Sequence, residues 1–270
     1  MTNVVVTGGY GVIGSHLVSA LLDRGDSVTV FDLAKNTRDT SIDFDRHANF
    51  RFVQGDVTDL AALAEALTPG VDTVFHLAAV VGVKNYPNDP LRVLDVNVTG
   101  TRNVLGLSHR HGTRVVFAST SEVFGKNPNP PFSEDDDRVL GSTKTARWSY
   151  STSKAMAEHL VFAMHAAYGL PVTVVRYFNV GSMTETTVRD VVELAIKIAN
   201  VDSVSGPEAV DTAARYGGRY EDIPRRIPDS TKAQRKLGWR LQIDVEEGLR
   251  RTIDWARANP WYLKEPAGDQ

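Results

Sequence analysis

The first 23 residues constrain the fold more than any other part of the chain. An apolar, β-branched run at Asn3–Thr7 leads directly into the turn Gly8-Gly-Tyr-Gly-Val-Ile-Gly14, and apolar residues at helical spacing follow over Ser15–Asp23. Glycines let the backbone turn tightly and approach a phosphate, and the start of a helix offers unpaired N–H groups. The pattern therefore predicts a strand, a dinucleotide-binding turn and a helix.

The next run ends at an acidic residue that suits the ribose of a dinucleotide. Ser27–Phe31 is expected to be a strand, and Asp32 follows it, eighteen residues after Gly14. A carboxylate accepts hydrogen bonds from ribose hydroxyls and repels a 2′-phosphate, so the sequence favours NAD over NADP. Lys35 and Arg38 lie close by and leave NADP open. An ordinary strand-end turn residue is the other interpretation of Asp32.

Strand-like and helix-like segments alternate along the chain. Further strands are expected at Phe50–Val53, Thr73–His76, Arg114–Ala118 and Pro171–Tyr177, with helices near 59–67, 91–110 and 144–168 between them and near 231–237 and 244–258 at the end. This order predicts an α/β fold with a Rossmann-type doubly wound parallel sheet and a small C-terminal substrate-binding lobe. We expect residues 1–180 to form the NAD-binding domain and 181–270 a reduced substrate-binding and helical part that does not fold independently.

Chemically suggestive residues lie at the ends of the expected strands. Gly8, Asp32, Asp56, His76 and Thr120 each stand at or just after such an end. Because the carboxyl ends of parallel strands share one edge of the sheet, these residues are expected to gather there. For His76 we expect ordinary hydrogen bonding at the strand end rather than a catalytic role.

Tyr150 and Lys154 are the strongest candidates for chemistry. They stand four residues apart in an expected helix, so they share one face of it, and the lysine ammonium can favour the phenolate form of the tyrosine. Such a phenolate is a usable general base. The pair alone is weak evidence, because this spacing is common on surface helices, but the predicted nucleotide-binding start strengthens it.

Composition limits the partners. The formal net charge of −3 provides no basic surface for nucleic acid or an anionic membrane, and no uninterrupted apolar span is long enough to cross a bilayer. The chain enters a strand at once, without a signal-peptide pattern, so a cytoplasmic protein is expected. The absence of cysteine excludes thiol nucleophiles and disulfides. No metal site is assigned, because the acidic run Ser133–Asp137 has no histidine or second carboxylate cluster beside it.

Together the motifs resemble a known family. They are Gly8-x-x-Gly11-x-x-Gly14, Asp32, His76-Leu-Ala-Ala79, Asn97, Ser119-Thr-Ser-Glu-Val-Phe-Gly125, Tyr150-x-x-x-Lys154 and Arg176-Tyr-Phe-Asn179. This set resembles the extended short-chain dehydrogenase/reductases that modify nucleotide sugars, over nearly the whole chain. The resemblance implies a retained NAD that takes hydride from a sugar carbon, usually C4, after which the ketone permits inversion, elimination or decarboxylation.

The resemblance also implies roles for individual residues. Tyr150 would deprotonate the C4 hydroxyl, Thr120 would hydrogen-bond the same oxygen, and Lys154 would hold the nicotinamide ribose and tune Tyr150. Asp56 and Val57 are placed to flank adenine. The residues expected to bind the cofactor are Gly8, Tyr10, Gly11, Val12, Ile13, Gly14, Asp32, Leu33, Asp56, Val57, Leu77, Ala78, Ala79, Asn97, Tyr150, Lys154 and Tyr177.

Segments around the catalytic pair and near the C-terminus resemble the UDP-glucuronate decarboxylase branch. By similarity Glu122 and Arg226 are catalytic and attend the substrate carboxylate and C5. Ser121 and Asn179 are expected to join them in binding the substrate, which the resemblance implies is a UDP-linked sugar. The same segments resemble UDP-sugar 4-epimerases, so both reactions stay open. A solvated carboxylate at Glu122 and a surface charge at Arg226 are the simpler interpretations.

One segment departs from the family pattern. Phe178-Asn-Val-Gly-Ser182 runs directly into the helical stretch after Thr186, where the family has several tens of residues of the substrate lobe. A naturally compact enzyme, an engineered deletion and a sequence that omits residues are the alternatives. The helices near 91–110 and 144–168 are apolar on more than one face and resemble the family's dimer contact, so a homodimer is expected. An NAD(P)-dependent carbonyl reductase and a catalytically impaired NAD-binding module are the alternative functions.

Overall fold

The computed structural model describes residues 1–35, 42–82, 88–179, 184–201, 206–208, 210 and 221–261. The chain forms two compact units. The first contains Met1–Val123 and Ala146–Tyr177, and the second contains Phe124–Thr145 and Phe178–Gln270. The first unit thus ends close to the predicted boundary at residue 180, while residues 124–145 group with the second unit.

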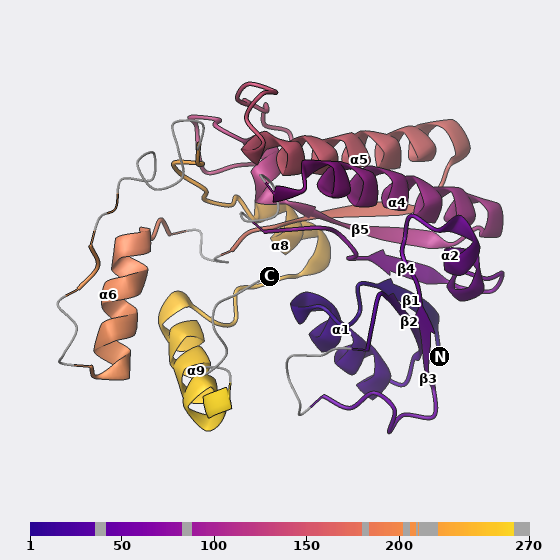
Figure 1. Ribbon diagram of the computed structural model, residues 1–270, viewed down its shortest axis with the longest axis horizontal. Helices are drawn as coiled ribbons and strands as arrows, with labels where there is room; N and C mark the ends of the chain where they lie inside the picture. The colour runs from indigo at the N-terminus through magenta and orange to yellow at the C-terminus, as the bar shows by residue number, and fades with distance from the viewer. Residues whose placement is uncertain are drawn as a thin grey trace. The chain divides into compact units, whose positions relative to one another are not determined.

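The first unit is built on a six-stranded parallel sheet (Figure 1). Its strands are β1 Asn3–Thr7, β2 Ser27–Asp32, β3 Phe50–Gln54, β4 Thr73–His76, β5 Arg114–Thr120 and β6 Val172–Tyr177, in the order β3-β2-β1-β4-β5-β6. The direction in which strands are added reverses between β1 and β4, and such a switch point is where open α/β sheets bind ligands. The predicted doubly wound sheet is confirmed.

Helices cover both faces of this sheet (Figure 1). Val4 and Val6 of β1 pack with Val18 of α1 (Val12–Asp23) on one face. Val5 packs on the other face, in a core with residues of α2 (Leu60–Ala66), α4 (Pro90–His111) and α5 (Arg147–Tyr168). Alternate side chains of one strand are therefore buried on opposite faces, as a parallel sheet between helices requires.

Local signals set the ends of the two long helices. The Asp89 side chain accepts a hydrogen bond from the Arg92 N–H, and Pro90 occupies the first turn, so α4 begins there. Both helices end at a glycine in the left-handed region, α4 at Gly112 with φ 70° and α5 at Gly169 with φ 68°. Helices α4 and α5 pack against each other along the sheet.

His76 is a buried link between elements. Its Nδ1 lies 2.7 Å from Thr7 Oγ1 on β1, and its Nε2 lies 3.1 Å from Thr101 Oγ1 on α4. Burial, with a smaller effect of the Lys154 charge, lowers the pKa of His76 to about 3. The ring is therefore neutral near pH 7, and the expected hydrogen-bonded role at the strand end is confirmed.

The second unit has little interior of its own. Its helices are α6 Val188–Ala199, α8 Thr231–Leu237 and α9 Val245–Ala258, and none of their residues, all of which the structure describes, is buried. Helices α6 and α9 pack against each other. Phe124 and Phe132 stack with ring centres 4.7 Å apart. The junction that the sequence shows as shortened falls largely on residues 180–183, outside the described part of the chain. Over the described ranges, no helix is both long and apolar enough to span a membrane.

Candidate active site

The glycine turn after β1 is packed so closely that a side chain at Gly8 or Gly14 would clash with the backbone. A Cβ on Gly8, whose φ is 73°, would lie 2.7 Å from the Ala78 backbone nitrogen, and one on Gly14 would lie 2.2 Å from the Gly8 carbonyl oxygen. Gly11 is the cap residue of α1 and has no side chain to occupy the first N–H groups of the helix. Those N–H groups remain available to a phosphate. The turn therefore fits the pyrophosphate of a dinucleotide.

Asp32 is fixed beside this turn. Its Oδ2 accepts a hydrogen bond from the Tyr10 N–H at 2.9 Å, and its Oδ1 accepts one from the Leu33 N–H at 2.8 Å. Burial raises the pKa of Asp32, although both hydrogen bonds act in the opposite direction. Each oxygen keeps an acceptor position suited to a ribose hydroxyl.

Lys35, one of the two basic residues that kept NADP possible, forms an ion pair with Asp45. Lys35 Nζ lies 2.9 Å from both carboxylate oxygens of Asp45. Arg38 falls outside the described residues. Val12, Ile13 and Leu33, all predicted to touch the cofactor, are exposed apolar side chains, and Leu77, Ala78 and Ala79 are half-buried. These exposed and half-buried apolar residues offer a surface against which the flat rings of a dinucleotide can pack.

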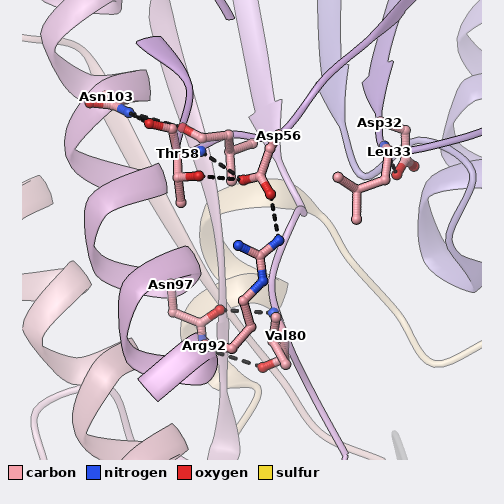
Figure 2. Close-up of polar contacts among 9 residues, drawn as sticks. Asp32, Leu33, Asp56, Thr58, Val80, Arg92, Asn97 and Asn103 are labelled. Carbon is pink, nitrogen blue, oxygen red and sulfur yellow. Dashed lines mark hydrogen bonds and ion pairs between the residues drawn. The ribbon is translucent and has the colours of Figure 1, made fainter. Parts of the chain in front are cut away.

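Helix α4 braces the predicted cofactor side (Figure 2). Asn97 Oδ1 accepts a hydrogen bond from the Val80 N–H at 2.9 Å, and its Nδ2 donates to Ser153 Oγ at 3.0 Å on α5. Asn97 thus joins the segment after β4 to both long helices. Direct contact of Asn97 with a cofactor stays a prediction.

The predicted catalytic pair is buried on α5. Lys154 Nζ donates to the Ala118 carbonyl of β5 at 2.9 Å and lies 4.8 Å from the centre of the Phe117 ring. Burial lowers the pKa of Lys154 to about 8, and the carboxylate of Glu158 opposes that shift. Tyr150, one helical turn earlier, is also buried and packs against apolar side chains that include Val93.

Thr120 ends β5 and is followed by the short 3₁₀ helix η1 (Ser121–Phe124). Thr120 Oγ1 accepts a hydrogen bond from the Glu122 N–H at 3.2 Å, so its O–H can be donated to a substrate oxygen. Ser151 Oγ, near the start of α5, donates to the Glu122 carbonyl at 2.6 Å and so connects α5 to η1. Thr120, Tyr150 and Lys154 therefore belong to one connected region.

Glu122 is buried and held by a charged partner. Arg147 Nη1 lies 2.5 Å from Glu122 Oε2, and Nη2 lies 3.2 Å from Oε1, a two-bond ion pair in which both side chains are nearly inaccessible. The interpretation of Glu122 as a solvated carboxylate is wrong. The two bonds fix the orientation of the Glu122 carboxylate. Rotating it away would leave the buried Arg147 charge without its partner, which is costly.

A second buried carboxylate escaped the sequence analysis. Glu158 lies one turn after Lys154 and accepts hydrogen bonds from Ser119 Oγ at 2.5 Å and from Arg176 Nε and Nη2 at 2.9 and 2.7 Å. Glu158 stands four residues after Lys154, as Lys154 does after Tyr150, so all three share one face of the helix. This spacing is the sequence signal that could have identified Glu158. The cluster joins α5 to β5 and β6.

The remaining candidates are divided between the two units. Arg226, half-buried, and Asn179, exposed, belong to the second unit, and their roles toward substrate stay predictions. Ser121 in η1 is buried, and among the described residues its Oγ finds no hydrogen-bond partner. Tyr177 ends β6 partly exposed, and burial raises its pKa. Within the described ranges, no group of three or more acidic or histidine side chains could hold a metal ion.

The similarity of the chain to known proteins agrees with this site. Residues 4–208 match the NAD dependent epimerase/dehydratase family. The UDP-N-acetyl-alpha-D-glucosaminuronate decarboxylase of Bacillus cytotoxicus is 32% identical, over 94% of this chain and 97% of that protein. The UDP-glucuronate 4-epimerase of Thermodesulfobacterium geofontis is 28% identical, over 96% and 98%. The chain therefore belongs to the NAD dependent epimerase/dehydratase family, and the predicted cofactor, NAD, is confirmed.

The fold has close counterparts among solved structures. The dTDP-glucose 4,6-dehydratase of Bacillus anthracis, solved in complex with NAD, superposes with a TM-score of 0.79 at 22% identity, covering 97% of this chain and 98% of that one. At this identity the likeness shows the fold alone. The alignment with the Bacillus cytotoxicus protein spans 315 positions, more than the 270 residues of this chain, so that relative carries residues that this chain lacks. This supports the predicted shortening.

We expect Gly14→Ala to disrupt the cofactor turn, because the new Cβ would meet the Gly8 carbonyl. NAD binding should weaken by more than about tenfold, equivalent to about 1.4 kcal/mol, measured by calorimetric titration. Gly106→Ala on α4 is the matched control, since a Cβ there meets nothing within 4 Å. The control should bind NAD normally and gain about 0.5–1 kcal/mol of stability. Unchanged NAD binding by Gly14→Ala would contradict the assigned turn.

We expect Glu158→Gln to lower the pKa of Lys154, because the carboxylate that favours the ammonium is removed. Lysine loses its charge as pH rises, so activity that needs the ammonium falls through about pH 8 in the wild type and at lower pH in the variant. The basic limb of the kcat/KM profile measures this. Glu65→Gln, at an exposed position on α2, is the control. Identical basic limbs in all three proteins would refute the coupling.

Proposed function

We propose that the protein oxidises a UDP-linked uronic acid at C4 and then removes its carboxyl group as carbon dioxide. The observation that carries the proposal is the buried Lys154, bonded to the strand that ends at Thr120 and one turn from Tyr150 on the same helix. The two relatives described above are named for uronic acid substrates, which supports the substrate class.

The first step uses groups of the first unit. NAD, when bound, supplies the acceptor for the hydride of the sugar carbon. The phenolate of Tyr150 takes the proton of the C4 hydroxyl while Thr120 donates a hydrogen bond to the same oxygen. The hydride can leave only as that proton is withdrawn, so base and donor must meet at one oxygen. Lys154, held as an ammonium, stabilises the phenolate before the proton arrives.

The second step follows from the position of the carboxylate. In a 4-keto uronic acid the carboxylate is β to the ketone. When the C5–C6 bond breaks, its electron pair moves to the C4 oxygen as an enolate and carbon dioxide leaves. Tyr150, now protonated, and Thr120 can both donate to that oxygen. C5 then takes a proton, which restores the C4 ketone. The hydride returns to C4 while Tyr150 gives its proton back to the C4 oxygen, so the only net loss from the sugar is carbon dioxide. We place Glu122, oriented by Arg147, near C5 of the sugar, and Arg226 at its carboxylate, which a guanidinium suits.

A second reaction, 4-epimerisation, is favoured by one observation. The relative from Thermodesulfobacterium geofontis is named a UDP-glucuronate 4-epimerase. The same ketone, turned over and reduced from its other face, would give the C4 epimer with the carboxylate retained. Both reactions share the oxidation step, so Thr120, Tyr150 and Lys154 have the same roles in each. The reactions differ in whether the ketone loses its carboxylate before it is reduced.

Incubation with UDP-glucuronate and with UDP-N-acetylglucosaminuronate tests the proposal. We expect the product to be lighter by one carbon dioxide, measured by mass spectrometry, with C4 stereochemistry assigned by NMR. Tyr150→Phe should lower kcat by at least about 100-fold, since general base catalysis contributes that much. Tyr168→Phe, at an exposed tyrosine of the same helix, should not. An unchanged mass with inverted C4 would indicate epimerisation, and no turnover of either substrate would refute the proposed function.

We also propose that the protein acts as a homodimer in the cytoplasm, with α4 and α5 at the contact. Large apolar side chains are exposed on both helices: Leu91 and Leu94 on α4, and Met156 and Phe162 on α5. Exposed apolar surface on two adjacent helices is a favourable contact for a second copy of the same pair.

We expect light scattering at micromolar concentration to give twice the chain mass of 29.6 kDa. Phe162→Glu should give the monomer mass, because it places a charge in the apolar contact. Leu60→Glu changes an equally exposed leucine on α2 and should remain dimeric. A monomeric wild type would contradict the proposed assembly without affecting the proposed reaction.

A further inference from the structure

The turn after β3 is held by an ion pair that the sequence analysis did not identify. Asp56 follows β3, and its Oδ2 bonds to Arg92 Nη2 in the first turn of α4 (Figure 2). The two residues are 36 positions apart in the chain. The pair is partly accessible, with 24% of the Asp56 side chain and 39% of the Arg92 side chain exposed. A ligand can therefore reach it.

The other oxygen of Asp56 is used locally. Oδ1 accepts hydrogen bonds from the Thr58 N–H at 2.9 Å and from Thr58 Oγ1 at 2.8 Å. A carboxylate oxygen accepts two such bonds, so Oδ1 is saturated. Oδ2 carries only the Arg92 bond among those found within the described residues, and one acceptor position remains on it. Asp56 is thus a fixed carboxylate that presents a single open acceptor.

Two further residues of helix α4, Asn103 and Gly100, contact the same turn. Asn103 Nδ2 donates to the Val57 carbonyl at 3.0 Å and to the Thr58 carbonyl at 3.1 Å (Figure 2). A Cβ on Gly100 would lie 2.5 Å from Val57 Cγ2, so the helix lies directly against this residue. These contacts hold the backbone of the turn, and the bond from Arg92 holds the Asp56 side chain in one orientation.

The position of this acceptor relative to Asp32 indicates its ligand. Strands β2 and β3 are adjacent and parallel, with Asp32 opposite Gln54, and Asp56 lies two residues beyond that pair. The base attached to a ribose at Asp32 would reach the neighbouring strand end. The 6-amino group of adenine is a hydrogen-bond donor and matches an open carboxylate acceptor, whereas a 6-keto group would be repelled by it.

We propose that Arg92 is a positioning residue for specificity at the adenine end of the NAD site, because it fixes the Asp56 carboxylate with one acceptor directed to the purine 6-position. This inference rests on the proposed function only in taking NAD as the resident cofactor. Burial alone would raise the pKa of Asp56, but the bonds from Thr58 and Arg92 outweigh it and lower that pKa. The carboxylate therefore stays charged over the physiological range.

Competition between two dinucleotides tests the inference. The full-length protein is equilibrated with equal concentrations of NAD and nicotinamide hypoxanthine dinucleotide, which has a 6-keto group, and the bound dinucleotides are quantified after desalting. The wild type should prefer NAD. Arg92→Met should reduce that preference by about tenfold, equivalent to about 1.4 kcal/mol. Arg102→Met, which changes an exposed arginine of the same helix, should leave it unchanged.

A double-mutant cycle separates positioning from general charge. Asp56→Asn should also reduce the preference, and Arg92→Met added to Asp56→Asn should have no further effect, since Arg92 acts through Asp56. An unchanged preference in Arg92→Met, or additive losses in the double variant, would overturn the inference. If the wild type turns over a UDP-uronic acid while Arg92→Met keeps its preference, only the inference fails. If the wild type retains neither dinucleotide, the NAD site and the proposed function fail together.

Discussion

The hydrogen bond from the Lys154 ammonium to the Ala118 carbonyl connects the chemistry to the fold. A buried ammonium is costly unless it is hydrogen-bonded and near an opposite charge, and here the carbonyl and the Glu158 carboxylate supply both. The bond fixes α5 against the end of β5. It thereby sets Tyr150, one turn earlier, relative to Thr120, two residues beyond Ala118. A helix displaced along this strand would lose the bond and would also separate Tyr150, the proposed base, from Thr120, the proposed donor.

The two long helices, α4 and α5, position different parts of the proposed site. Helix α5 holds the proposed reacting end through Lys154 and through the ion pair of Arg147 with Glu122. Helix α4 holds the adenine end through Arg92 and the segment after β4 through Asn97. Because α4 and α5 pack against each other over one sheet face, the two ends of the site have a common support. Precise spacing between a cofactor and a base needs such a rigid arrangement.

Local patterns were sufficient to predict the strands, the glycine turn and the helix that carries Tyr150 and Lys154. The predicted end of β5 at Ala118 was too early, because Ser119 and Thr120 are polar, and their pairing with Arg176 and Tyr177 of β6 extends the strand. The charged pairs could not be predicted in the same way. Glu158 meets Arg176 of β6 18 positions later, and Asp56 meets Arg92 after 36. Only the packing of α5 beside β6, and of α4 against the turn after β3, brings these partners together.

The proposed catalytic residues of the first unit are held in place, although this chain lacks residues that its relative carries. The bonds described above for Thr120, Glu122 and Lys154 lie within the first unit, while the helices of the second unit have no buried residue among those described. Bonds within the first unit therefore hold Thr120, Glu122 and Lys154, whereas Arg226, proposed at the substrate carboxylate, belongs to the second unit. Contacts with remote parts of a substrate do provide binding energy that orients the reacting carbon. A lobe with fewer contacts provides less of that energy, so the preformed order of Lys154, Glu122 and their partners must supply more of the alignment.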